Sequence, residues 1–207
     1  MAEPFERLSR EILVENPWHR YCRDRYVQRD GSEGEYFYVD MAGSAGIIPL
    51  FEDGTTQLVQ VRRYLLGAWL WEFPIGGMNP GEDALGVARK ELAEETGLRA
   101  GTWTELGRFA PYKGVSNEIT WFWLAEDLEQ GDRALEPSED IRVERLPLAE
   151  ARERLLGQEL LDGQSLGGLM LLDRYLAMGS RPGPGAGPGV QAESAKNRRS
   201  GSSEGES

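Results

Sequence analysis

Three glutamates, Glu91, Glu94 and Glu95, stand close together in a stretch whose composition favours a helix. Residues three and four apart share one face of a helix, so these carboxylates are expected to project from the same side, with Arg89 and Lys90 on other faces. Like charges at this spacing cost an isolated helix roughly 0.2 to 0.5 kcal/mol per pair, so another group should neutralise them. Carboxylate oxygens suit Mg²⁺ or Mn²⁺ better than zinc. The residues alone therefore predict either a divalent-metal site or a solvated acidic face.

A strand, a glycine-rich loop and a helix must position these carboxylates. Residues 69–74, Trp-Leu-Trp-Glu-Phe-Pro, are predicted to form a strand that leads into the glycines. Residues 78–81, Met-Asn-Pro-Gly, carry a turn signal, and from Asp83 the composition favours a helix. Gly97 stands where a glycine commonly follows a helix C-terminus.

Two adjacent arginines, Arg62 and Arg63, precede this region. Adjacent exposed arginines usually form a solvated surface. Ahead of an acidic metal site, however, they can also bind a diphosphate through two-pronged hydrogen bonds. The sequence leaves both interpretations open.

The spacing of the loop and helix residues resembles the signature of the Nudix hydrolases, which cleave nucleoside diphosphates linked to another moiety. The signature is a glycine, five residues, a glutamate, seven residues, and then the pattern basic-Glu-Leu-x-Glu-Glu-x-Gly-Leu. Lys90 stands where the family has arginine, and lysine keeps the charge but loses the planar two-pronged grip on a carboxylate. The matching positions are Gly76, Glu82, Glu91, Leu92, Glu94, Glu95, Gly97 and Leu98.

The resemblance assigns roles to residues in and around the signature. It implies that divalent metal, Mg²⁺ with Mn²⁺ as the alternative, is held by side chains of the helix and by one backbone carbonyl. The implied site comprises the metal ligands Ile75 (backbone carbonyl), Glu91, Glu94 and Glu95, the supporting residues Glu82 and Lys90, and the substrate contact Glu72.

The general base is expected outside the helix, because a carboxylate bound to two cations is a poor proton acceptor. Residues 136–140 resemble the acidic loop that supplies a base or an extra metal ligand in the ADP-ribose pyrophosphatase branch. Glu139 is the first candidate and Glu136 the second, with an acidic surface loop as the alternative. Glu118 is a further candidate, since related sugar-nucleotide hydrolases carry a glutamate at the matching place. Lys113 replaces a proline that is usual in the ADP-ribose branch. A lysine there could contact another anionic group, so Lys113 is a candidate substrate contact, and sugar nucleotides and phosphorylated compounds remain possible substrates.

Composition limits the other possibilities. A chain of 207 residues suits one domain of moderate size, and its net charge of −12 argues against a nucleic-acid-binding face. The single cysteine, Cys22, excludes an intramolecular disulfide. Neither a secretory signal nor an apolar run of membrane-spanning length is present, so we expect a cytoplasmic protein. Because His19 is the sole histidine, carboxylate-and-metal chemistry is favoured over a catalytic triad or a multi-histidine zinc site.

The expected fold is α/β, a mixed sheet sandwiched by helices. The resemblance implies the Nudix α/β/α sandwich, preceded by an N-terminal antiparallel β ribbon. Turn signals at 29–32 and 52–55 predict two hairpins. Strands are expected at 18–28, 35–41, 46–51, 57–62, 69–74, 103–112, 119–125 and 143–146, and helices at 83–96, 148–156 and 165–177.

Three parts of the chain are expected. Residues 1–42 form the β ribbon, which in the resembling branch commonly pairs across a dimer. Residues 43–177 form the Nudix domain. Residues 178–207 contain almost no large apolar side chains and are expected to be a disordered tail, because they cannot bury enough surface to offset their ordering entropy.

The expected function is metal-dependent hydrolysis of the diphosphate linkage of ADP-ribose or a similar nucleoside diphosphate sugar, giving a nucleoside monophosphate and a sugar phosphate. The expected partners are this small-molecule substrate and a second copy of the chain in a homodimer, with no nucleic acid and no membrane. One alternative is a non-catalytic Nudix module that binds a nucleotide sugar; such a module would ordinarily have lost the ligand carboxylates. Another is an RNA-end hydrolase, which the negative charge disfavours.

Overall fold

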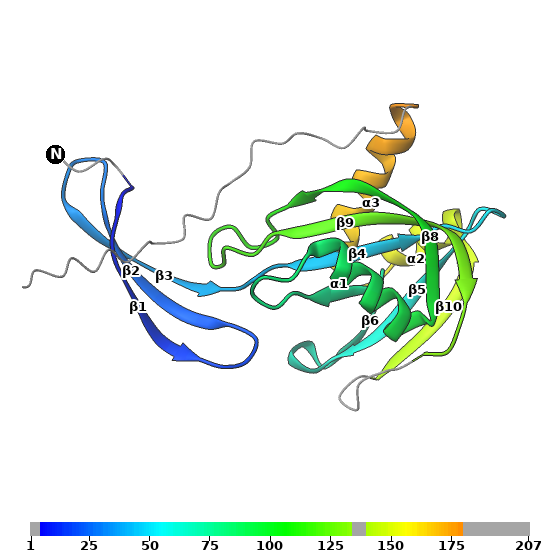
Figure 1. Cartoon of the computed structure of the whole chain (residues 1–207), viewed down its shortest axis with the longest axis horizontal. Coiled ribbons are helices and arrows are strands. Elements are labelled where there is room, and N and C mark those ends of the chain that lie inside the picture. The colour runs from blue at the N-terminus through cyan, green and yellow to red at the C-terminus, as the bar shows by residue number, and fades with distance from the viewer. Residues whose placement is uncertain (1–4, 134–139, 180–207) are drawn as a thin grey trace, which may run out of the picture.

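The computed structural model describes residues 5–133 and 140–179, and it shows a three-stranded ribbon followed by a domain of two sheets and three α-helices (Figure 1). The predicted base candidates Glu136 and Glu139, and residues 180–207 of the predicted tail, lie outside the described residues. None of the helices in the described ranges has the length and apolar character needed to cross a membrane. The elements in chain order are β1 (Arg7–Glu15), β2 (Arg20–Val27), β3 (Glu33–Asp40), β4 (Ser44–Pro49), β5 (Thr55–Arg63), η1 (Tyr64–Leu66), β6 (Ala68–Glu72), β7 (Ile75–Gly77), α1 (Ala84–Glu91), η2 (Leu92–Thr96), β8 (Leu98–Phe109), β9 (Thr120–Gln130), β10 (Ile141–Pro147), α2 (Leu148–Leu156) and α3 (Gly163–Ala177).

The domain is built on two sheets with helices on their outer faces. One sheet has the strand order β7-β4-β9-β8; within it β4 and β9 run parallel and the other pairs run antiparallel. The second sheet has the order β10-β5-β6 and is antiparallel. Helix α1 packs against β4, β7 and β9, α3 packs against β4, β8 and β9, and α2 packs against the second sheet (Figure 1). The predicted α/β/α sandwich with a mixed sheet is confirmed.

Strand β4 is the centre of the domain, because all of its residues are buried. Successive side chains of a strand point to opposite faces. Ala45 and Ile47 therefore pack with the apolar side of α1, whereas Ile48 joins the core that includes Leu169 and Leu172 of α3. This two-sided burial explains why the strand reads as a nearly continuous apolar run.

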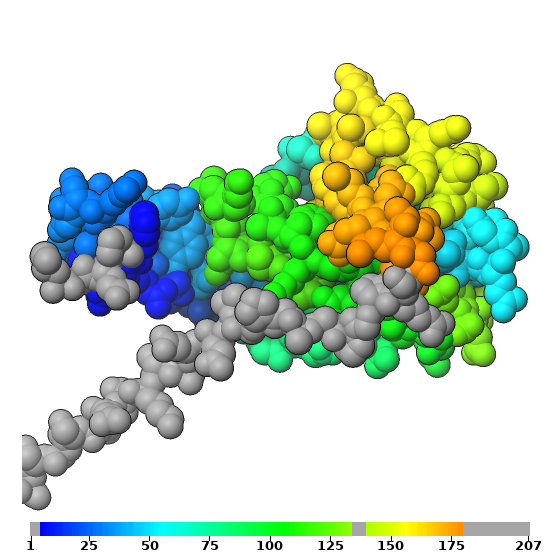
Figure 2. All heavy atoms as spheres, turned by 90° about the horizontal axis from the view of Figure 1, so that it is seen from above, coloured from blue at the N-terminus to red at the C-terminus, as the bar shows by residue number. Residues whose placement is uncertain are grey.

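The N-terminal ribbon lies against one end of the domain (Figures 1 and 2). Strands β2 and β3 pair antiparallel across the turn at residues 29–32, which confirms the first predicted hairpin. Strand β1 was not predicted and adds a third strand beside β2, with every residue exposed. Register shifts at Arg7/Ser9 and Ile12/Val14 break its alternation, so residues 7–15 carry no clear period of two.

The prediction of a second hairpin is correct at its turn, but the two flanking strands do not pair with each other. The Phe51 N–H donates to the Thr55 carbonyl over 2.9 Å, and Leu50 forms a single bridge with Thr56. The two strands then separate, β4 into the mixed sheet and β5 into the second sheet. The turn signal is local, whereas the pairing of each strand depends on partners far away in sequence.

Candidate active site

The carboxylate-bearing helix begins and ends where its sequence indicates. The Asp83 side chain accepts a hydrogen bond from the Gly86 N–H over 2.9 Å, so it caps the N-terminus of α1. The regular helix ends at Glu91, and Leu92–Thr96 continue it as a wider π-helical turn, a form that is frequent at functional sites. Gly97 then closes the helix in the left-handed conformation, with φ of 76°.

One cleft of about 480 Å³ brings together most of the residues that the sequence singled out. It lies between the glycine strand β7, the helix and the second sheet. Glu72, Glu82, Lys113 and Glu118 are not among the residues that line it. The predicted site residues in its wall are Arg62, Arg63, Ile75, Lys90, Glu91, Glu94 and Glu95.

The three helix carboxylates differ in exposure. The side chains of Glu91 and Glu94 are 12% and 31% exposed, and Glu95 is buried at 5%. The expectation that Lys90 points to another face is wrong: its Nζ lies 3.7 Å from Glu91 and 3.3 Å from Glu94. The flexible lysine stem allows this, because residues three and four apart on a helix are neighbours and an adjacent carboxylate is also within reach. Lys90 therefore partly neutralises the cluster.

Gly76 is required by its distance from the helix. A Cβ atom at this position would overlap the carboxyl group of Glu91, so any other residue would displace that side chain. The neighbouring Gly77 has no such constraint, since a Cβ there would meet nothing within 4 Å. The first glycine of the signature thus makes room for a carboxylate.

The donor set of the cleft fits a hard divalent cation. Three carboxylates and the residue with the implied carbonyl ligand, Ile75, supply oxygen donors in one wall. Within residues 5–133 and 140–179, however, no three acidic, histidine or cysteine side chains are gathered closely enough to enclose one ion. The carboxylates are on a common wall, and two of them face Lys90.

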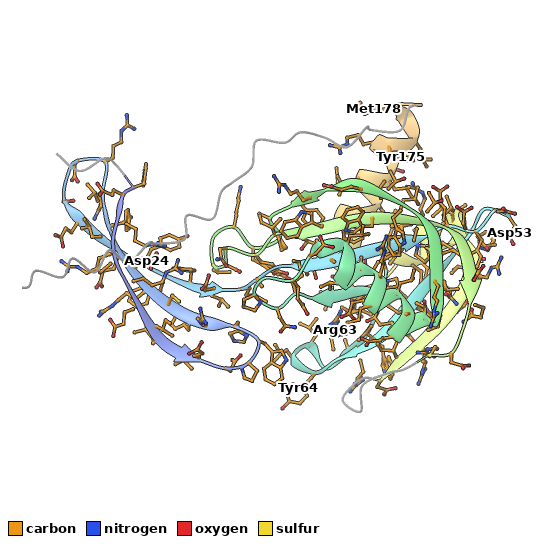
Figure 3. All side chains as sticks on the ribbon, viewed as in Figure 1. Asp24, Asp53, Arg63, Tyr64, Tyr175 and Met178 are labelled. Atoms are coloured by element: carbon orange, nitrogen blue, oxygen red, sulfur yellow. The ribbon has the colours of Figure 1, made fainter. Side chains whose placement is uncertain are left out.

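Arg63 is held at the cleft by a buried carboxylate. Its Nε donates to Glu72 over 2.8 Å and its Nη2 makes a second bond to the same group. Glu72 is 1% exposed, and burial raises its pKa, although Arg63 opposes that shift. The hydrogen bonds that Arg63 donates to Glu72 in turn raise the pKa of Arg63. Figure 3 shows Arg63 at the end of β5, while the adjacent Tyr64 protrudes from the turn between β5 and β6.

Arg62 and Arg63 have different partners in the structure. Neighbouring residues of a strand point to opposite faces, and the Arg62 guanidinium lies 6.0 Å from the centre of the Trp69 ring rather than beside Arg63. Arg142 stacks on the same ring at 4.4 Å. Both arginines line the cleft, but of the two Arg63 is the one whose guanidinium is fixed by a carboxylate, Glu72.

Glu82 supports the loop. Its carboxylate accepts a hydrogen bond from the Asn79 N–H over 2.7 Å, and this bond lowers the pKa of Glu82. The side chain lines a neighbouring cavity of about 590 Å³, whose other wall is the turn between β1 and β2. Trp18 of that turn borders both cavities and was not predicted as a site residue. No local pattern could reveal it, because the contact joins segments that are far apart in sequence.

Glu118 and Lys113 lie elsewhere. Glu118 is 6% exposed and accepts a hydrogen bond from the Ser44 hydroxyl over 2.8 Å, in a buried polar cluster where β4 and β9 begin. Lys113 is exposed on the turn at residues 111–115, which contacts the ribbon through the hydrogen bond between the Tyr36 hydroxyl and the Gly114 carbonyl.

Comparisons with known proteins agree with this architecture. A model of the NUDIX domain matches residues 41–163. An ADP-ribose pyrophosphatase from Mycobacterium tuberculosis is 29% identical over 188 residues, which span 89% of this chain and 91% of the relative. An ADP-ribose pyrophosphatase from Bacillus subtilis is 27% identical over 148 residues, which span 69% and 80%.

The fold also has a solved counterpart. The crystal structure of an ADP compounds hydrolase matches with a TM-score of 0.71, covering 87% of this chain and 98% of the other at 19% identity. The signature residues, the cleft that they line and the matching family model lead to one assignment. The chain belongs to the Nudix family and is a Nudix hydrolase similar to the ADP-ribose pyrophosphatases.

Proposed function

We propose that this protein hydrolyses the diphosphate linkage of ADP-ribose or a similar nucleoside diphosphate sugar, giving a nucleoside monophosphate and a sugar phosphate. The proposal depends on one observation: Glu91, Glu94, Glu95 and Arg63 line a single cleft. The acidic side chains are suited to divalent metal and the guanidinium to phosphate oxygens. The names of the two bacterial relatives make ADP-ribose the first substrate to test.

Glu91, Glu94, Glu95 and the Ile75 carbonyl would hold Mg²⁺, or alternatively Mn²⁺. A bound divalent ion supplies charge neutralisation for the diphosphate and lowers the pKa of an attacking water. Glu91 and Glu94 would have to turn away from Lys90 to share such an ion, because both now contact its ammonium group.

Arg63 would bind and orient the diphosphate. Two bonds to Glu72 fix its guanidinium, and the remaining N–H groups of the guanidinium can bind a ligand. Because Glu72 is buried behind it, Glu72 would act on the substrate through Arg63. Arg62 and Lys113 remain candidates for contact with other anionic parts of the substrate.

The base that deprotonates the attacking water is proposed to be Glu139, with Glu136 as the second candidate. Both lie outside the described residues. The residues that follow them, Asp140 and Ile141, line the cleft, so the chain enters the cleft wall directly after this acidic segment. A carboxylate from there would be free of the helix ligands and could accept a proton.

We also propose that residues 1–42 mediate a homodimer, that residues 43–177 form the hydrolase domain, and that the protein is cytoplasmic. The ribbon exposes Phe5, Ile12, Val14, Trp18 and Phe37, and apolar surface of this kind marks association sites. Light scattering of the purified chain and of Val14→Glu tests the dimer. A monomeric wild-type chain would contradict it.

The central experiment is the turnover of a panel of nucleoside diphosphate derivatives with Mg²⁺, with the products identified by chromatography. Glu95→Gln removes a charged ligand and should lower the rate by roughly a thousandfold while the melting temperature stays close to that of the wild type. Glu105→Gln, an exposed glutamate on β8, is the control and should be fully active. Near-normal turnover by Glu95→Gln at saturating Mg²⁺ would refute the metal assignment. A wild-type protein that binds nucleotide sugars without cleaving them would be a binding module.

A further inference from the structure

We propose that Glu118 is a positioning residue. In this proposal Glu118, Ser44, Thr120 and Gln164 form a buried clamp that fixes the glycine strand β7 against the carboxylate helix, and so sets metal affinity. This inference rests on the proposed function only in taking the cleft to be the metal site. It gives Glu118 a different role from the general base that its sequence context suggested.

The clamp joins three elements through short contacts. The Ser44 hydroxyl donates to Glu118 Oε1 over 2.8 Å and lies 2.9 Å from the Thr120 hydroxyl. The Gln164 amide, in the first turn of α3, lies 3.0 Å from both hydroxyls and 3.4 Å from Glu118 Oε1. Ser44, Thr120 and Glu118 are 4%, 0% and 6% exposed. Such a buried polar network is rigid when its members are satisfied, and it specifies a single arrangement.

The clamp is directly connected to the cleft wall. Ser44 is the first residue of β4 and pairs with Gly77 of β7 on one side and with Thr120 of β9 on the other. The preceding residue, Gly43, accepts a hydrogen bond from the Met78 N–H over 2.9 Å. The three-residue strand β7 therefore has its place set by the same few residues of β4 that the clamp holds.

Small displacements of β7 would reach the metal ligands. β7 begins at Ile75, whose carbonyl is an implied ligand, and Gly76 follows, with no room for even a methyl group beside the Glu91 carboxyl. A clearance this small means that a shift of β7 must move Glu91 or change its rotamer. The clamp would thus act on metal affinity through position, without contact to metal or substrate.

The position of Glu118 argues against direct proton transfer. Its Oε1 is engaged by Ser44 and Gln164, and the residue is not among those that line the cleft. A general base must be within hydrogen-bond reach of the attacking water, directly or through one other water. The observed contacts instead make Glu118 an acceptor that orients the Ser44 hydroxyl.

A matched pair of substitutions tests the clamp. Thr120→Val and Thr56→Val each replace a fully buried threonine by an isostere and remove one hydroxyl. The Thr56 hydroxyl donates to the Pro49 carbonyl over 2.7 Å, at the far end of β4. We would measure the Mn²⁺ dissociation constant by the electron paramagnetic resonance signal of free Mn²⁺, together with melting temperature and turnover. Gln164→Leu is a second clamp variant, and Glu118→Gln keeps the acceptor oxygen.

Thr120→Val and Gln164→Leu should weaken Mn²⁺ binding by roughly 10- to 100-fold, as substitutions that disturb ligand orientation do. Thr56→Val should lower the melting temperature and leave Mn²⁺ affinity unchanged. Glu118→Gln should retain turnover within about threefold, whereas loss of a general base lowers kcat by roughly 10² to 10⁴. Three results would each overturn the clamp. The first is an unchanged Mn²⁺ affinity in both Thr120→Val and Gln164→Leu, and the second is an equal loss of Mn²⁺ affinity in Thr56→Val. The third is a fall of kcat by roughly 10² or more in Glu118→Gln with normal Mn²⁺ binding. If no substrate is cleaved while the Mn²⁺ pattern holds, only the proposed function fails.

Discussion

The carboxyl group of Glu91 lies against the α-carbon of Gly76, in space that any side chain at residue 76 would fill. This contact joins the glycine strand to the carboxylate helix. It explains in physical terms why a glycine and a glutamate separated by fourteen residues belong to one site. It also provides a sharp test of the site, because the adjacent glycine has no such neighbour.

Gly76→Ala should displace Glu91 and weaken Mn²⁺ binding by at least roughly tenfold, with a matching loss of kcat/KM. Gly77→Ala is the control, because its Cβ meets nothing within 4 Å, and it should retain Mn²⁺ affinity and melting temperature. Titration with Mn²⁺ and thermal denaturation check both variants. Equal Mn²⁺ affinity in the two proteins would show that Glu91 is not a ligand.

Lys90→Ala should lower both the melting temperature and the rate. The ammonium group now offsets the repulsion between Glu91 and Glu94, although its half-exposed position limits the effect on stability to about 1 kcal/mol or less. Lys90→Arg should preserve or improve activity, because the guanidinium adds a planar two-pronged contact. Melting curves in EDTA and steady-state kinetics measure these effects. Wild-type behaviour in Lys90→Ala would mean that the residue is merely solvated.

The burial of Glu72, in its ion pair with the half-exposed Arg63, predicts a pH dependence of stability. Burial raises the pKa of Glu72 above its ordinary value of 4.5, so the folded state binds this proton more tightly than the unfolded state does. The contribution of Glu72 is therefore fully present below pH 4.5 and is lost as pH rises through the raised value. The free energy of unfolding of the wild type minus that of Glu72→Gln should fall over this window, as measured by urea denaturation. If this difference in the free energy of unfolding rises with pH instead, the pKa of Glu72 is lowered by folding and not raised.

The same variant should separate binding from chemistry. Without Glu72, Arg63 loses the partner that orients it, so KM should rise by roughly tenfold while kcat changes less. Arg142→Ala, which removes a guanidinium stacked on Trp69 outside the proposed catalytic groups, is a suitable comparison. Steady-state kinetics on the best substrate of the panel decide the point. An unchanged KM would place Arg63 outside the substrate site.

Glu139→Gln should lower kcat by roughly 10² to 10⁴ and leave substrate binding nearly intact if Glu139 is the base. If it is instead a metal ligand, the Mg²⁺ concentration needed for half-maximal rate should also rise. One metal titration that includes Glu136→Gln distinguishes the two glutamates. Full activity in both variants would mean that the general base is one of the helix glutamates.

The carboxylate helix could be predicted from the sequence because the signals that define it are local. The Asp83 cap, the carboxylate spacing and Gly97 lie within fifteen residues, and each acts on its own neighbourhood. The orientation of the Lys90 side chain could not be predicted from the sequence, because a long flexible side chain can reach either of two carboxylates. The ammonium group of Lys90 is drawn to the carboxylates of Glu91 and Glu94, an attraction that the directions of side chains on an ideal helix do not include.

Contacts between segments that are distant in sequence account for the other differences between the predicted and the observed structure. Nothing near Trp18 marks it as part of a cleft that also contains Arg63, and the burial of Glu118 depends on Ser44 and Gln164. The sequence of β1 has no regular alternation because bulges interrupt its pairing. In each case the decisive partner is supplied by the fold and leaves no periodic trace in the sequence.

The π-helical turn at Leu92–Thr96 makes the length of this segment as important as its composition. Each residue of a regular helix advances the side-chain direction by about 100°. Inserting or deleting one residue between Glu91 and Glu95 would therefore turn the second carboxylate away from the cleft, even if every acidic residue were kept. Deletion of Ala93 alone would thus separate Glu91 from Glu94 and Glu95 in direction, although all three carboxylates would still be present.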